Sequence, residues 1–165
     1  MSPPLVILDT NVLFGVTTRD LLFQFAAQGL WRCGWSQNIQ QELVRLGVVV
    51  ENSALLPGDY RTLAPTGLPD PADEHVLHCA LAHQASMLLT YNLKDFPRHL
   101  TRGIRVLTPD AALVKLLREH PQTAMRAIEA HWSECEEKKS WASYVARLNR
   151  ARLHGLSRAL ASLRL

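Results

Sequence analysis

The amino-acid sequence predicts an α/β fold in which helices flank a parallel sheet, followed by an all-helical C-terminal extension. Residues 5–8 form a short apolar run, which is typical of a strand buried on both faces of a parallel sheet. Segments of strand and helix character then alternate, as in chains that build parallel sheets. Beyond Pro121 no strand pattern remains. We therefore expect an α/β domain over residues 1–110 and a helical extension over residues 111–165.

Local signals place the elements of the predicted domain. Ser36 is a favoured N-cap residue, and Asp70 followed by Pro71 is a strong helix start, because proline is tolerated at the first helical position. Between the two helices that these residues begin, proline and glycine predict a loop over residues 48–69, with at most one short turn of helix. The predicted strands are 5–8, 33–35, 87–91 and 105–107, and the predicted helices are 18–30, 37–46, 70–85 and 109–120.

The extension is predicted to be helical and basic. Residues 1–110 contain eight Lys and Arg against ten Asp and Glu, a net charge of −2, whereas residues 111–165 contain ten against five, a net charge of +5. Three interpretations of the basic residues stay open: contact with RNA phosphates, a solvated helix face, or docking of an acidic partner. The predicted helices are 122–135, 141–154 and 156–163, with Trp141, Tyr144, Val145 and Leu148 on one apolar face. The basic residues after Glu137 are Lys138, Lys139, Arg147, Arg150, Arg152, Arg158 and Arg164, of which Arg147, Arg150 and Arg158 approach one helical side.

The composition excludes several classes of protein. A chain of 165 residues, 47% of them hydrophobic, can bury the core of one domain, and no apolar run approaches the roughly 20 residues of a membrane span. The first residues lack the basic start and long apolar core of a signal peptide, so a cytoplasmic chain is expected. The three cysteines are widely spaced and form no C-x-x-C pattern, and no glycine-rich phosphate-binding motif is present.

Carboxylates and an amide follow the predicted strands. Asp9 comes directly after the first strand, and Asn92 and Asp95 follow the strand that ends near residue 91. Asp73 lies in the first turn of the helix before that strand, and Glu42 lies in the helix that Ser36 begins. Functional groups collect at the carboxyl ends of parallel strands, and a divalent cation with oxygen ligands relieves the repulsion between carboxylates that converge there. The joint placement therefore predicts a Mg²⁺ or Mn²⁺ site.

Each of these residues also has a structural interpretation. Asp9 suits a turn at a strand end, Asp73 suits a capping box, and Glu42 suits a solvated helix. Asn92 and Asp95 suit a tight turn. Taken one by one, the residues favour these interpretations, so the metal site depends on their combination. A zinc site on one helix is a further alternative, since His75, Cys79 and His83 recur every four residues with His78 nearby, but one helix face rarely supplies four ligands, and a half-buried face is favoured.

Four ordered blocks between residues 5 and 110 resemble the PIN domain. They are Val-Ile-Leu-Asp-Thr-Asn-Val-Leu at residues 6–13, Ser36 followed by Glu42-Leu43, Asp-Pro-Ala-Asp-Glu-His-Val-Leu at residues 70–77, and Leu-Thr-Tyr-Asn-Leu-Lys-Asp-Phe at residues 89–96. The resemblance implies a PIN-like fold and a Mg²⁺- or Mn²⁺-dependent ribonuclease of the kind found as VapC-type toxins. By this match, the metal residues are Asp9, Glu42 and Asp73, the further catalytic residues are Asn92 and Asp95, and the supporting residues are Thr90 and Asn11.

Two departures from the family pattern stand out. Asn92 is neutral where many relatives carry a fourth aspartate, and the segment between Glu42 and Asp73 is short and loop-like where many have another helix. The implied partners are an RNA substrate, a cognate antitoxin and a second copy of the chain, and the extension resembles that of some VapC-like toxins. Two rival functions stay open: a housekeeping RNA-processing nuclease, and an inactive PIN-like module that binds RNA or protein.

Overall fold

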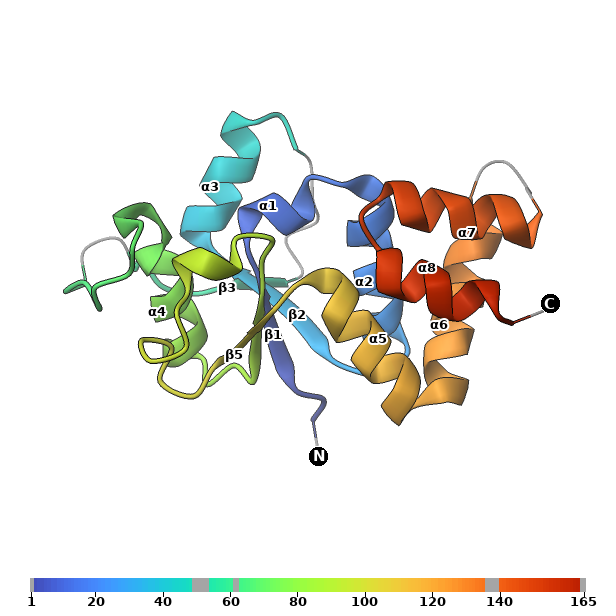
Figure 1. Ribbon diagram of the computed structural model, residues 1–165. Coiled ribbons are helices and arrows are strands. Elements are labelled where there is room, and N and C mark those ends of the chain that lie inside the picture. Colours follow the sequence, from blue (N-terminus) through green and yellow to red (C-terminus); the bar gives the residue numbers. More distant parts are fainter. Residues whose placement is uncertain (1, 49–53, 61–62, 136–139, 164–165) are drawn as a thin grey trace. The chain divides into compact units, whose positions relative to one another are not determined.

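The structure is a computed structural model that describes residues 2–48, 54–60, 63–135 and 140–163 (Figure 1). Short 3-10 turns at Pro71–Asp73 and Leu93–Asp95 accompany the main elements. The main elements are, in order, β1 (Leu5–Leu8), α1 (Thr10–Leu13), α2 (Val16–Ala27), β2 (Arg32–Ser36), α3 (Gln37–Arg45), β3 (Leu55–Leu56), α4 (Glu74–Ala82), β4 (Met87–Leu89), β5 (Arg105–Leu107), α5 (Pro109–Glu119), α6 (Pro121–Glu134), α7 (Trp141–Arg150) and α8 (His154–Ala161).

The five strands form one parallel sheet in the order β3-β2-β1-β4-β5 (Figure 1). The prediction of an α/β fold with a parallel sheet and flanking helices is therefore confirmed. All four residues of β1 are buried, because β1 is the central strand, paired with β2 on one side and β4 on the other. The chain adds strands on one side of β1 and then crosses to the other side. The carboxyl ends of β1 and β4 are thus the switch point of the sheet, where parallel sheets place their ligands.

Several elements differ from the prediction, three of them in a way that the structure explains. The segment 48–69 contains the edge strand β3, whose two residues pair with Trp35 and Ser36, so the prediction of a loop with at most one short turn of helix was wrong there. The helix predicted from Asp70 begins as a 3-10 turn and ends at Ala82, since Gln84 has a left-handed φ of 52°. The helix predicted over 141–154 ends at Arg150, and the helix predicted over 156–163 is α8, which begins at His154; Arg152, between the two, has a left-handed φ of 66°.

The chain divides into two compact units. The first contains residues 1–14 and 31–108 and includes the whole sheet with α1, α3 and α4. The second contains residues 15–30 and 109–165, so α2 groups with the C-terminal helices rather than with the sheet that precedes and follows it in sequence. In the described part of the chain, no helix has the length and apolar character needed to cross a membrane.

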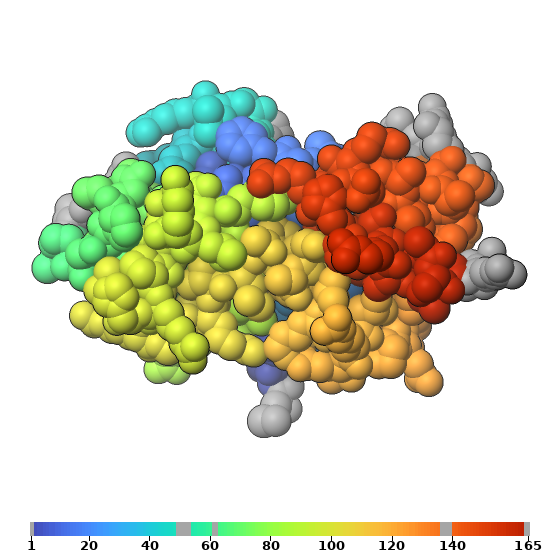
Figure 2. All heavy atoms as spheres, in the orientation of Figure 1, coloured from blue at the N-terminus to red at the C-terminus, as the bar shows by residue number. Residues whose placement is uncertain are grey.

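The second unit is a helical bundle with its own core. The predicted apolar face of α7 is confirmed, since Tyr144, Val145 and Leu148 are buried. The ring centroids of Trp141 and of Trp132 on α6 lie 5.1 Å apart. Asp110 on α5 caps α8 by accepting hydrogen bonds from two of its backbone amides. Figure 2 shows that α7 and α8 also lie on the molecular surface.

Candidate functional site

Asp9 is the centre of the candidate site. It follows β1 directly and caps α1, because Oδ1 accepts from the backbone N–H of Thr10 at 2.7 Å. Oδ2 accepts from the hydroxyl of Thr90 at 2.8 Å and from the amide of Asn11 at 3.0 Å. The side chain is thus held from both β1 and β4. Burial raises the pKa of Asp9 above its ordinary value, although hydrogen bonds from Thr90 and Thr10 oppose the shift.

Thr90 and Asn11 tie the ends of β1 and β4 together. The Thr90 hydroxyl accepts from the backbone N–H of Asn92 at 3.0 Å, and the side-chain oxygen Oδ1 of Asn11 accepts from the backbone N–H of Tyr91 at 3.1 Å. The predicted supporting residues therefore lie beside Asp9. The side chain of Asn92 is exposed, and its backbone N–H is the group that contacts Thr90.

Glu42 reaches the same region from α3, which Ser36 begins by accepting from the backbone N–H of Ile39. One carboxylate oxygen accepts from the Thr10 hydroxyl, and the other lies 3.0 Å from Nε2 of His75. Partial burial acts to raise the pKa of Glu42, but the hydrogen bonds from His75 and Thr10 outweigh it, so the pKa is lowered overall. Glu42 is thus joined to Asp9 through Thr10, which contacts both carboxylates.

Asp73 and Asp95 approach the same place from the two 3-10 turns. Burial raises the pKa of Asp73 to about 7, with further increases from the charges of Asp9, Asp70 and Asp95. Such an effect requires that the carboxylates lie within electrostatic range of one another. Asp9 and Asp95 therefore lie within electrostatic range of Asp73 in the first unit, and binding of a metal ion by these residues stays a prediction.

The carboxylates do not form a closed ligand set. Among the residues that the structure describes, no three His, Cys, Asp or Glu side chains are arranged so that they could hold one metal ion. Both oxygens of Glu42 contact hydrogen-bond donors, on Thr10 and His75, and both oxygens of Asp9 accept hydrogen bonds, from Thr10, Asn11 and Thr90. The three residues of the zinc alternative have separate surroundings: His75 contacts Glu42, Cys79 is fully buried, and His83 contacts Tyr60.

Two contacts at the site are not predicted by the sequence. No sequence pattern gives the Thr10 hydroxyl a role, and His75 belongs only to the zinc alternative. His75 is buried, and only its position two residues after Asp73 indicated that it lies near the site. Both contacts join residues more than 30 positions apart, so no local pattern predicts them.

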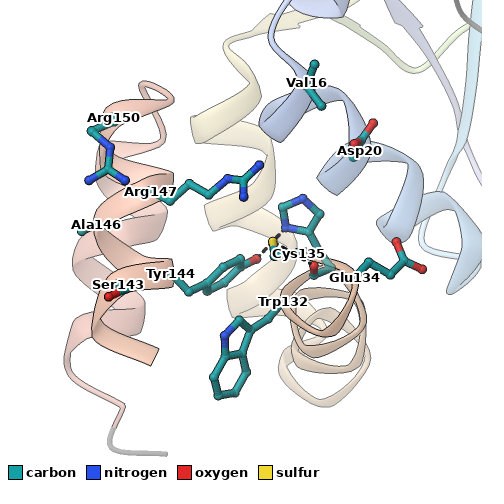
Figure 3. A pocket seen from close by; sticks show the side chains of 11 residues that line it. Val16, Asp20, Trp132, Glu134, Cys135, Ser143, Tyr144, Ala146, Arg147 and Arg150 are labelled. Carbon is teal, nitrogen blue, oxygen red and sulfur yellow. Dashed lines mark hydrogen bonds between the residues drawn. The ribbon is translucent and has the colours of Figure 1, made fainter. Parts of the chain in front are cut away.

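The predicted RNA-contacting arginines lie in the second unit. Arg147 and Arg150, one turn apart on α7, line a cavity of about 790 Å³ among α2, α6 and α7 (Figure 3). Arg147 donates from Nε to the Thr17 hydroxyl at 3.1 Å, whereas Arg150 and Arg158 are exposed. Contact with RNA stays a prediction for all three, and Lys138, Lys139 and Arg164 lie outside the described residues.

Comparison of the chain with protein-family models, with curated proteins and with solved structures found no match. The parallel sheet and the grouping of Asp9, Glu42, Asp73 and Asp95 are therefore the observations from which a function is argued.

The raised pKa of Asp73 makes a prediction for stability without metal. The folded protein keeps this proton up to about pH 7, whereas the unfolded chain loses it near pH 4, at about the ordinary value. The folded state binds more protons between these values, so the free energy of unfolding falls as the pH rises from about 4 to about 7. Asparagine cannot ionise, so Asp73→Asn should not show this fall in the free energy of unfolding. In EDTA, we expect its melting temperature to exceed that of the wild type by more at pH 8 than at pH 5. An equal difference at both pH values contradicts the electrostatic cause.

Proposed function

We propose that the chain is a metal-dependent endoribonuclease of the PIN type. One observation carries the proposal: Asp9 and Glu42 are joined through Thr10 beside the carboxyl end of β1, and Asp73 lies within electrostatic range of Asp9 and Asp95. The parallel sheet with its flanking helices is compatible with a PIN-like fold. The resemblance of the sequence blocks to that family supplies the reaction class.

The donors suit a hard divalent cation. All are oxygen atoms, which Mg²⁺ and Mn²⁺ prefer, and the raised pKa values of Asp9 and Asp73 indicate that negative charge here is unfavourable without a counter-ion. Asp9, Glu42 and Asp73 would hold the ion, which requires these carboxylates to come closer together than they lie in the structure. A bound divalent cation would polarise a phosphodiester and lower the pKa of a bound water.

The remaining residues fix the position of Asp9. Thr90 and Asn11 both donate to one oxygen of Asp9, and the Thr10 amide donates to the other. Lone pairs of the carboxylate stay available for a ligand in this arrangement, since a carboxylate has about four acceptor sites. Asp95, on the turn after β4, would bind waters or a second ion, a role for which the neutral Asn92 is less suited.

The experiment is an RNA-cleavage assay on the purified full chain. Structured and single-stranded RNAs are incubated with Mn²⁺, with Mg²⁺ and with EDTA. We expect cleavage with either metal and none in EDTA. Binding of RNA without cleavage under any metal condition would instead support the inactive module.

We further propose, from the resemblance alone, that the nuclease is a toxin held inactive by a cognate antitoxin and active on RNA in the cell. Induced expression should then arrest growth, and expression of Asp9→Asn should not. Equal growth in the two cultures, with cleavage preserved in the purified protein, would favour the housekeeping nuclease.

The extension is proposed to contact RNA through its exposed arginines. Replacing both Arg150 and Arg158 by Gln should weaken RNA binding and lower the slope of log affinity against log salt by about 0.7 for each single-strand phosphate that is no longer neutralised. The change removes no hydrogen bond that ties α7 to α2, unlike a change at Arg147. Fluorescence anisotropy at several salt concentrations measures the RNA affinity.

The matched control replaces the exposed Arg98 and Arg105 of the first unit by Gln. An equal loss of RNA affinity in the two double variants would show that the extension contributes only general positive charge and no specific contact.

A further inference from the structure

His75, at the start of α4, is a buried residue with a polar atom that the described part of the chain leaves without a hydrogen-bond partner. Its side chain is only 7% exposed. Nε2 lies 3.0 Å from a carboxylate oxygen of Glu42, and because a carboxylate only accepts, Nε2 is the donor. Nδ1 is buried and has no hydrogen-bond partner among the described residues. A buried polar atom without a partner costs folding free energy, so His75 is not placed here for stability alone.

Glu42 is the long side chain that needs such a partner. It extends from the solvent-facing margin of α3, and its side chain is 36% exposed. A glutamate so placed has several rotamers, and ordering it at a metal site costs conformational entropy. His75 engages one carboxylate oxygen and Thr10 the other, so the two donors fix both oxygens before any ligand arrives. Each carboxylate oxygen keeps a further lone pair for a cation.

We propose that His75 is a positioning residue that orients Glu42 for the divalent cation. This inference rests on the proposed function, because Glu42 is a metal residue only in that proposal. Hydrogen bonds to ligating side chains orient them, and the loss of such a bond commonly lowers metal affinity 10- to 100-fold. His75 acts through the hydrogen bond from Nε2, and no contact of His75 with the metal is involved.

The test measures Mn²⁺ affinity by calorimetry, without RNA, together with the melting temperature in EDTA. His75→Gln places an amide N–H where Nε2 lies and keeps the bond to Glu42. His75→Leu and His75→Asn remove it, and the asparagine variant keeps a polar group should the leucine variant fold poorly. The control is His99→Leu, at an exposed histidine.

We expect His75→Leu and His75→Asn to bind Mn²⁺ at least ~10-fold more weakly than the wild type. His75→Gln and His99→Leu should stay close to the wild type. The melting temperature of His75→Leu in EDTA should be no lower than that of the wild type, since the unpartnered Nδ1 leaves with the ring. A residue that serves the fold alone would show the opposite, a lower melting temperature with unchanged affinity.

The outcomes separate the two proposals. Equal Mn²⁺ affinity in the wild type and His75→Leu, or an equal loss in His75→Gln, overturns the role of His75 and leaves the nuclease proposal intact. Mn²⁺ binding with the expected variant pattern but no RNA cleavage overturns the nuclease and leaves the role of His75. Absence of Mn²⁺ binding by the wild type overturns both.

Discussion

Asp9→Asn is expected to lower the rate of RNA cleavage about 100-fold or more. Asp9 is the central carboxylate of the site, and losing a direct ligand should cost at least as much as the 10- to 100-fold loss from removing a residue behind a ligand. The asparagine has the same shape but lacks the charge that would hold the cation. Single-turnover cleavage in saturating Mn²⁺ measures the effect.

The fold should tolerate this change. Asparagine still accepts from the Thr10 amide, and the Thr90 hydroxyl can accept from it instead of donating. The Asn11 amide loses one acceptor and keeps the Thr90 hydroxyl as the other. Asparagine is uncharged, so the variant does not pay the free-energy cost of burying the Asp9 carboxylate, and this effect stabilises the folded state. We expect the free energy of unfolding to change by about 1 kcal/mol or less. Asp20→Asn, on α2, is the matched control and should cleave like the wild type. Equal cleavage rates for Asp9→Asn and Asp20→Asn would remove Asp9 from the mechanism.

Glu74→Gln is expected to lower the free energy of unfolding by about 3 kcal/mol. The buried Glu74 carboxylate begins α4 and accepts four hydrogen bonds from the preceding loop. The donors are the backbone N–H groups of Thr66, Gly67 and Leu68 and the Thr66 hydroxyl, at 2.8–2.9 Å. These bonds lower the pKa of Glu74 against the effect of burial. A glutamine would turn an N–H₂ group toward two of the donors, leaving them without an acceptor.

Urea-induced unfolding measures this loss, and the control is Glu129→Gln at an exposed position on α6. Equal midpoints for the two variants would show that the loop does not depend on Glu74. The consequence for function is indirect: Glu74 follows Asp73, so a loosened loop also displaces a proposed metal residue, and cleavage should fall together with stability.

Much of the fold follows from local sequence. The apolar run at Leu5–Leu8 identified the central strand because burial on both faces leaves no polar position. Ser36 and Asp70 identified helix starts because each side chain caps backbone amides nearby in sequence. The edge strand β3 was missed because it has two residues in a segment rich in proline and glycine. Only its pairing with Trp35 and Ser36 makes it a strand.

The candidate site shows the same division. Asp9 was predicted to lie near Asn92 and Asp95 because these residues follow strands, and adjacent parallel strands end at one edge of the sheet. Thr90 was assigned a supporting role by the resemblance alone, and the structure places its hydroxyl 2.8 Å from Oδ2 of Asp9. The hydrogen bonds of Glu42 depend on how α3 and α4 are placed, which a single sequence does not encode in any short pattern. Thr10 and His75 were therefore the partners that the structure added.

The most direct test of the metal-dependent nuclease is a Mn²⁺ titration of the EDTA-treated wild-type chain, with RNA cleavage and melting temperature followed in the same samples. The account predicts that both rise over one range of Mn²⁺ concentration, since a bound ion stabilises the folded state and enables the reaction. Asp9→Asn should show neither rise. Cleavage that is as fast in EDTA as in Mn²⁺, or that is unchanged in Asp9→Asn, would contradict it.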